Sequence, residues 1–498
     1  MKNYISLLKN KKSRFEMRIL KSSYSKKKNK IIPQIHCLER YQRKLTLLSA
    51  LGVISMASVP KRVNAQCDPV NDTFLISSGI PNNFKGDPRV AMDANGNYVV
   101  VWEEYTDYYS KRDVYGRRYA ANGTSLGSPF IINEYNTYNQ GDPSIAMQAN
   151  GDFIVVWVSD GQDEDGFGIF GRRFQANGTP IGGEFPVNLY TTDDQEDPDI
   201  AIDENGNFVV VWESLYQLGD FVEGYEIFAR LFDASGMPLT GEIQVNQHTT
   251  NSQIDPRIAM HSDGTFVVVW ESDGQDGDGD GVYGRRFDNI GLPLGDEFQI
   301  NQFTTEGQSD PDIAMDCLGN FVVVWESTNQ DMDDRAVVAR RYQADGSPLG
   351  DEFIVNTGTT GHQDDPSITM DCMGNFVITW EDARFPFDVI FAQCFDAQGE
   401  RMGDEFQVVQ LDNGTSFWDP SAAMDNNGNL VIVFESETYI YDNEYEYGIH
   451  GQRYTCLKSA EPDPIPTIGQ WGMIIMGLFL SILASVVIKN KNLQIEKR

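Results

Sequence analysis

Two short segments of the chain are dense in aspartate, a side chain that often binds hard metal ions. The seven residues are Asp160, Asp163 and Asp165 in SDGQDEDGFG, and Asp273, Asp276, Asp278 and Asp280 in SDGQDGDGDG. Alternating Asp and Gly residues let a loop curl several carboxylates around Ca²⁺, which accepts about six to eight oxygen ligands. The two loops are therefore candidate Ca²⁺ sites. The alternative is an acidic turn in which glycine only permits the bend. The second loop departs from an EF-hand, because Phe287 stands where that motif needs Glu.

Paired arginines also recur along the chain, at Arg117/Arg118, Arg172/Arg173, Arg285/Arg286 and Arg340/Arg341. A catalytic arginine would be unique rather than serial. We predict instead that these side chains pair across strands with the glutamate that follows a recurring tryptophan, as at Glu213, Glu271 and Glu326.

Residue patterns typical of enzymes are missing from the sequence. His248, His261, His362 and His450 share no metal-binding spacing. The sequence contains neither a nucleophile elbow nor a phosphate-binding loop. DENGNFVVVW, which begins at Asp203, weakly resembles the Asp-box turn of sialidase propellers, but the Ser or Thr positions of that turn are absent. A polysaccharide-acting enzyme of the sialidase or lyase type remains the alternative to a binding protein.

The elements that would carry these loops repeat along the chain. GNFVVVWES occurs at 206–214 and again at 319–327. The same register places an Asp-Pro pair at Asp87, Asp142, Asp197, Asp255, Asp310, Asp365 and Asp419. It also places an aromatic residue at Trp102, Trp157, Trp212, Trp270, Trp325, Trp380 and Phe434. Both series advance by about 55 residues, and such a period is typical of repeat architectures.

Each copy is predicted to form four strands. In the fourth copy these are PRIAM, TFVVVWES, GVYGRRFD and DEFQIN, and Asn-Gly or Asp-Gly supplies the first hairpin turn. Seven such units predict a seven-bladed β-propeller over 66–456, whereas β-sandwiches need about 100 residues each. We expect the tryptophans to fill the gaps between blades. The repeats, best seen at 159–174 and 272–287, resemble DGQDGDGxGVxGRRFD-type repeats of large secreted bacterial proteins, a likeness that implies no settled activity.

The last copy lacks its fourth strand, and NDTFLISSG at 71–79 matches the missing segment, with Phe74 in the place of Phe298. We predict that this N-terminal strand completes the seventh blade, so that no sheet edge stays open. Cys67 and Cys456 then share one tight turn, and we predict a disulfide between them, with two free thiols as the alternative. The sequence leaves the pairing of Cys317, Cys372 and Cys394 open.

Both ends of the chain carry targeting signals. Residues 1–65 contain a long basic lead, the apolar run LTLLSALGVISMA and the cleavage-type sequence VNAQC, which together indicate a secretory signal peptide, with Met1 or Met17 as its start. A Pro-rich spacer occupies 457–464. Residues 465–498 then combine a short sequence motif, an uncharged helix predicted over 471–488 and a basic tail. The motif residues are Ile465, Pro466, Thr467, Trp471 and Gly472.

This C-terminal layout resembles the IPTL-type sorting signal of Gram-negative bacteria, although Ile468 follows Thr467 where the signal has Leu. The resemblance implies an exosortase-like partner enzyme in the inner membrane, removal of the tail and release to the cell surface or outside. The alternative is a plain membrane anchor.

The net charge of −34 excludes a nucleic-acid partner, because such a surface repels polyanions. We expect an exported, non-enzymatic propeller that binds a surface polymer or a protein.

Overall fold

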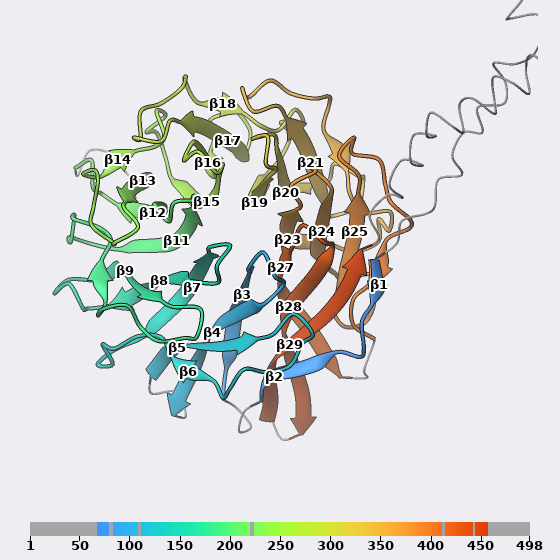
Figure 1. The fold of residues 1–498 in the computed structure, drawn as a ribbon. Coiled ribbons are helices and arrows are strands. Elements are labelled where there is room, and N and C mark those ends of the chain that lie inside the picture. The colour runs from blue at the N-terminus through green and yellow to red at the C-terminus, as the bar shows by residue number, and fades with distance from the viewer. Residues whose placement is uncertain are drawn as a thin grey trace, which may run out of the picture. The chain divides into compact units, whose positions relative to one another are not determined.

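The computed structural model describes residues 67–78, 83–107, 111–219, 224–410, 414–441 and 444–456. They form seven antiparallel sheets, which are the blades of a β-propeller arranged around a central axis (Figure 1). The predicted fold is therefore confirmed. The signal peptide, the spacer, the sorting motif and the 471–488 segment lie outside the described residues. Within those residues we find no helix with the length and apolar character of a membrane span.

Each blade is ordered from the axis outward. The innermost strands are β3 (Lys85–Met92), β7 (Gln140–Met147), β11 (Gln195–Ile202), β15 (Gln253–Met260), β19 (Gln308–Met315), β23 (Gln363–Met370) and β27 (Thr415–Met424). The second strands are β4 (Tyr98–Asp107), β8 (Phe153–Asp160), β12 (Phe208–Leu215), β16 (Phe266–Asp273), β20 (Phe321–Thr328), β24 (Phe376–Asp382) and β28 (Asn429–Tyr441). The third strands are β5 (Lys111–Tyr119), β9 (Phe167–Phe174), β13 (Tyr225–Phe232), β17 (Asp280–Phe287), β21 (Arg335–Tyr342), β25 (Val389–Phe395) and β29 (Glu444–Cys456).

The fourth strands are shorter than the sequence predicts. They are β6 (Phe130–Ile131), β10 (Phe185–Pro186), β14 (Ile243–Gln244), β18 (Phe298–Gln299), β22 (Phe353–Ile354) and β26 (Phe406–Gln407). An asparagine side chain replaces the next backbone acceptor: Asn301 Oδ1 accepts the Val282 N–H at 3.0 Å. The chain can therefore leave the sheet without leaving a buried backbone N–H unpaired.

The ring closes as predicted. β1 (Cys67–Pro69) and β2 (Phe74–Ser78) both pair with β29 of the seventh blade. Phe74 lies opposite Gly451, just as Phe298 lies opposite Gly284 in the fourth blade. A Cβ atom on Gly451 would come within 2.6 Å of the Phe74 ring, so the glycine makes room for that ring.

The hydrophobic core lies between neighbouring blades. All six tryptophans of the series, and Phe434, are fully buried. On β12, Val210 and Trp212 pack against the preceding blade, whereas Val209 and Val211 pack against Trp270 of the following one. Both faces of each second strand are therefore buried, which explains the continuous apolar run in its sequence.

The arginine pairs do not bind the glutamates, so that prediction was wrong. The first arginine of each pair reaches the outer segment of the preceding blade, as when Arg285 Nη1 donates to Val245 O, just after β14, at 2.8 Å. The second reaches the following blade, as when Arg173 Nη1 donates to Ala234 O at 2.9 Å. Adjacent residues on a strand point in opposite directions, so one pair joins three blades.

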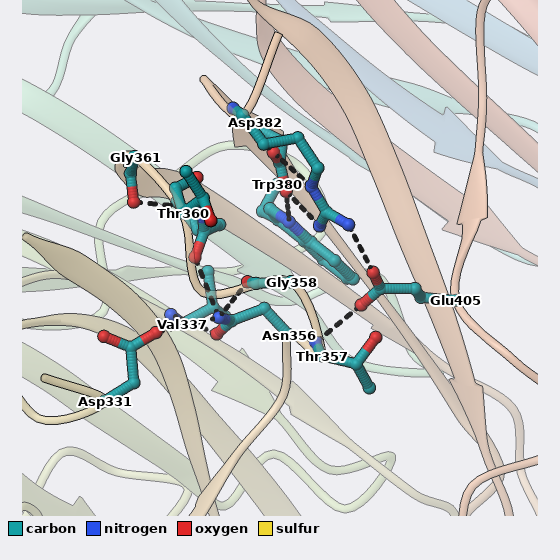
Figure 2. Close-up of polar contacts among 12 residues, drawn as sticks. Asp331, Val337, Asn356, Thr357, Gly358, Thr360, Gly361, Trp380, Asp382 and Glu405 are labelled. Carbon is teal, nitrogen blue, oxygen red and sulfur yellow. Dashed lines mark hydrogen bonds and ion pairs between the residues drawn. The ribbon is translucent and has the colours of Figure 1, made fainter. Parts of the chain in front are cut away.

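A second contact between blades uses a glutamate of the outer segment. In blades 5 and 6, Glu405 Oε2 accepts the Thr357 N–H at 2.6 Å, and its Oε1 accepts Arg384 Nη1 at 2.7 Å (Figure 2). In the fourth blade Gln275 takes the place of this arginine and donates to Glu297 at 2.8 Å. In blades 4 and 6 the loop after the second strand is thus tied to the outer segment of its own blade.

Candidate binding site on the propeller axis

Seven aspartates from the Asp-Pro pairs surround the central axis. Each lies at a bulge of its innermost strand, where the register with the second strand shifts, as between Glu196 and Asp199. All seven adopt a left-handed backbone conformation, with φ between 45° at Asp365 and 52° at Asp255. Aspartate tolerates this conformation better than most residues, and the bulge redirects its side chain.

In several blades the glutamate after the buried tryptophan supports this ring from the preceding blade. Glu213 Oε2 accepts the Asp255 N–H at 3.0 Å, and Glu381 Oε1 accepts the Asp419 N–H at 2.7 Å. Because the following proline has no N–H, the aspartate amide is the last donor before the bulge. The second blade lacks this support, since Val158 occupies the position.

Six of the seven aspartates, all but Asp255, line a cavity of about 290 Å³ on the axis. Two residues further along each strand lies a mixed layer, made of Arg89, Ser144, Asp199, Arg257, Asp312, Ser367 and Ser421. The next residue along is apolar and also lines the cavity, as at Val90, Ile145, Ile200, Ile258, Ile368 and Ala422. The pocket therefore joins a carboxylate ring to an apolar layer through a layer that breaks the sevenfold pattern.

The mixed layer is fixed by bonds between blades. Asp199 Oδ2 accepts the Ile258 N–H at 2.9 Å, and its Oδ1 accepts the Ser144 hydroxyl at 2.7 Å. Asp312 Oδ2 accepts the Ile368 N–H at 2.8 Å. Arg257 is half-buried, and Asp255, Asp199 and other nearby carboxylates raise its pKa despite its desolvation. Asp199 and Asp312 are therefore occupied by hydrogen bonds within the protein. The aspartate ring carries the negative charge that remains available to a ligand in the pocket.

Burial raises the pKa of carboxyl groups both in the aspartate ring and among the glutamates that support it. It raises the pKa of Asp142 to about 6 and that of Asp197 and Asp419 to about 7, with neighbouring aspartates adding to the effect. Among the supporting glutamates it raises the pKa of Glu213, Glu271 and Glu435 to about 9, and that of Glu381 to about 10. Near neutral pH the glutamates are protonated, whereas ring aspartates are in part ionised.

These shifts predict that the propeller loses stability as the pH rises. A carboxyl group whose pKa is higher in the folded state than in the unfolded state favours folding below the folded pKa. Raising the pH from about 6 to about 9 removes protons from glutamates such as Glu213 and Glu435 and should lower Tm progressively. Calorimetry at constant ionic strength measures the effect, and a Tm that is flat or rises over this range would contradict the burial of these groups.

The acidic loops use several of their polar groups within the fold. Asp276 Oδ2 accepts the Asn301 side-chain N–H at 3.1 Å, and Gln162 donates to Glu184 at 2.8 Å. Burial raises the pKa of Asp163 and of Asp280. Asp165 and Asp278 lie in these loops, whereas Asp160 and Asp273 end the strands β8 and β16 that precede them. Among the described residues, the carboxylates that come within 4.8 Å of one another in groups of three lie elsewhere, as Asp87, Glu103 and Asp142, and as Asp364, Asp365 and Glu381. Calcium binding by the loops stays a prediction.

The cysteines form two disulfides. Cys67 and Cys456 are joined as predicted, with their Cα atoms 3.9 Å apart, and close the ring across 389 residues. Cys317 and Cys372, whose pairing the sequence left open, link the first hairpin turns of blades 5 and 6. Cys394 is a buried free thiol, and burial raises its pKa to about 12.

Sequence reasoning located the seven aspartates but treated them only as markers of the repeat. A signal was present: seven copies keep Asp before Pro, although a turn alone would accept other residues. The convergence of these side chains becomes visible once the copies are placed around one axis.

No protein-family model matches the sequence, and no curated protein matches it. Among solved structures, the chain is similar to a protein of unknown function from Dyadobacter fermentans, with 11% identity over 78% of this chain and 99% of that chain, at a TM-score of 0.46. It is similar to an α-L-arabinanase from Penicillium chrysogenum, with 15% identity over 64% and 92% and a TM-score of 0.43. It is also similar to a sialidase from Streptococcus pneumoniae, with 10% identity over 77% and 70% and a TM-score of 0.43. The chain's own strand pairings make it a seven-bladed β-propeller.

Proposed function

We propose that the chain is an exported, non-enzymatic binding propeller that takes a ligand with ammonium groups into its axial pocket. The observation that carries this proposal is the cavity of about 290 Å³ whose wall joins six aspartates of the ring to an apolar layer. Carboxylates in a partly desolvated cavity attract cations more strongly than they do in water. The apolar layer favours an organic cation, because it can cover the carbon chain between charged groups.

The spacing of the carboxylates supports an organic cation over one bare metal ion. Ca²⁺ needs about six to eight oxygens at about 2.3–2.6 Å. Among the described residues, Asp87 and Asp142 of the ring approach one another within 4.8 Å together with Glu103, but the seven aspartates do not gather as one such group. A chain carrying several ammonium groups can contact the ring at separate points.

Binding of spermidine, used as a probe with several ammonium groups, tests the proposal. Calorimetry of the exported propeller near pH 8 should show saturable binding. The double change Asp142→Asn and Asp197→Asn should weaken it by about tenfold or more, roughly the 1.4 kcal/mol or more that losing charge-assisted hydrogen bonds costs. Asp160→Asn, at the end of β8 and outside the cavity, is the matched control and should bind like the parent. Equal affinity for the parent and the double variant would sink the proposal.

A polysaccharide-acting enzyme is the alternative function. The feature in its favour is the presence of carboxyl groups of different pKa near one pocket, as a glycosidase requires. Against it, Glu213, Glu381 and Glu435, which have some of the most raised pKa values, do not line the cavity. Turnover of any member of a glycan panel, lost on changing one ring aspartate, would favour the enzyme.

The proposal includes export through the signal at 1–65 and sorting through 465–498 by an exosortase-like enzyme. It is supported by the order of the sequence signals, and the secreted or surface-bound chain should end before Trp471. Intact mass measurement of the exported protein checks this order of events.

A calcium effect is expected in addition. If the loops around Asp163 and Asp276 bind Ca²⁺ only when folded, millimolar Ca²⁺ should raise Tm relative to a sample in EDTA. The double change Asp276→Asn and Asp278→Asn should reduce the shift. Superimposable melting curves with and without Ca²⁺ would refute calcium binding and leave the axial pocket unaffected.

A further inference from the structure

A groove of about 980 Å³ lies at the junction between blades 6 and 7. On the side of blade 6 its wall includes Phe406, Val408 and Val409. On the side of blade 7 it is lined by β1, β2 and β29 and includes Leu75 and Tyr454. The groove runs along the seam at which the N-terminal strand completes the ring.

The groove lies where the series of arginine links between blades is interrupted. Arg285 shows the usual arrangement, in which the guanidinium lies 5.6 Å from the Phe287 ring and donates to the preceding blade. In blade 6, Arg401 substitutes for the missing first arginine and donates to Ile354 O at 3.0 Å. In blade 7 the position is Gln452, which donates to Asn71 O at 3.0 Å within its own blade. Among the described residues, no arginine crosses from blade 7 to blade 6.

The walls of the groove combine apolar rings with an unused donor. Phe406 is half-buried and Leu75 is 48% exposed, whereas the lining rings of Phe417 and Tyr454 are almost fully buried. The Gln407 side-chain Nε2 is buried and has no hydrogen-bond partner. Such a wall suits an extended Pro-rich segment, because proline packs on aromatic rings and offers carbonyl acceptors without an N–H to bury.

We infer that the groove is the docking site of this chain's own residues 457–470, LKSAEPDPIPTIGQ. Cys67 lines the groove and is paired with Cys456, so the segment starts at the end of the groove. In a polyproline conformation the six residues to Pro462 span ~19 Å. The six steps along β29 from Cys456 back to His450, which also lines the groove, span ~20 Å. Pro462 can therefore lie level with His450, and Pro464 and Pro466 follow it.

Docking would hold Ile465, Pro466 and Thr467 near the propeller rather than on a free tether. The folded propeller would then set where the C-terminal segment begins relative to the seam. This inference does not depend on what the axial pocket binds, and its test does not use that pocket.

Hydrogen exchange of the full chain in detergent, followed by mass spectrometry, tests the docking. Backbone amides between Leu457 and Glu461 should exchange at least about tenfold more slowly than an unstructured peptide does. Leu75→Arg places a charge on an exposed wall residue and should abolish this protection without unfolding the blade. Leu349→Arg is the matched control, since Leu349 is 42% exposed on blade 5 and lies outside the groove, and it should retain the protection.

Exchange of the groove's own amides provides a second test of the docking. In a chain whose residues 457–470 are replaced by Gly and Ser, Val409 and Gln410 should exchange faster, and an added synthetic 457–470 peptide should reverse the change. The same peptide with Pro462, Pro464 and Pro466 changed to glycine should fail to do so. Unprotected amides in the parent chain, or protection that persists in Leu75→Arg, would overturn the inference. Protection that increases with protein concentration would assign the groove to a second copy and would also overturn it.

Discussion

Changing Trp325 to alanine should lower the free energy of unfolding of the propeller by about 3–5 kcal/mol. Trp325 is fully buried and packs against Val267 and Val269 of the preceding blade. Removing its side chain therefore leaves a cavity that the neighbouring sheets cannot fill. Denaturant unfolding followed by fluorescence or circular dichroism gives the value.

Trp325→Phe is the matched control, because the seventh blade carries Phe434 at the equivalent position and buries it fully. The Trp325 indole N–H is buried without a hydrogen-bond partner, so phenylalanine removes an unpaired donor as well as some volume. The control should lose much less stability than the alanine variant. Equal losses, or a loss below about 1 kcal/mol for alanine, would contradict the packing role of the series.

Removing the seam disulfide should have a comparable effect. Cys67→Ser with Cys456→Ser should destabilise the exported propeller by about 2–5 kcal/mol, because the bond constrains the unfolded chain across a loop of 389 residues. The loss should appear first as faster proteolysis near β1 and β2, which the bond anchors to β29. Denaturant unfolding and limited proteolysis measure the two effects.

Cys317→Ser with Cys372→Ser is the control for the removal of a disulfide as such. This bond closes a loop of only 55 residues and joins blades 5 and 6, so its loss should leave proteolysis at the seam unchanged. Unaltered seam proteolysis in the variant that lacks Cys67 and Cys456 would contradict the role of the bond in closing the ring.

The repeat made the fold predictable, because its period, hairpin turns and missing last strand all specify one closed ring. The Cys67–Cys456 bond followed from the same register. The partners of the arginines could not be predicted in this way. Pairing Arg285 with Glu271 assumed a contact within one sheet, whereas Arg285 extends to Val245 O of the preceding blade. The curvature that brings neighbouring blades within reach is not encoded in the strand period.

The axial pocket shows the same limit. The bulge at each Asp-Pro pair turns the aspartate to a left-handed φ, and no alternation pattern reports such a turn. The residue two positions after each of these aspartates varies, for example Arg89, Ser144 and Asp199. The sequence alone could not show that these variable positions line one cavity around the axis. The aspartate layer repeats in all seven blades, whereas the next layer differs from blade to blade. This departure from the repeat marks the axial pocket as a candidate site rather than a purely structural feature.

An electron-density map of the exported propeller crystallised with spermidine near pH 8 tests the central claim most directly. The account predicts the amine on the axis, with its nitrogen atoms within about 3 Å of ring carboxylates such as Asp142 and Asp197 and its methylene groups toward Ile145 and Ile200. An amine bound only on the outer surface, with an axial cavity that holds water alone, would contradict it.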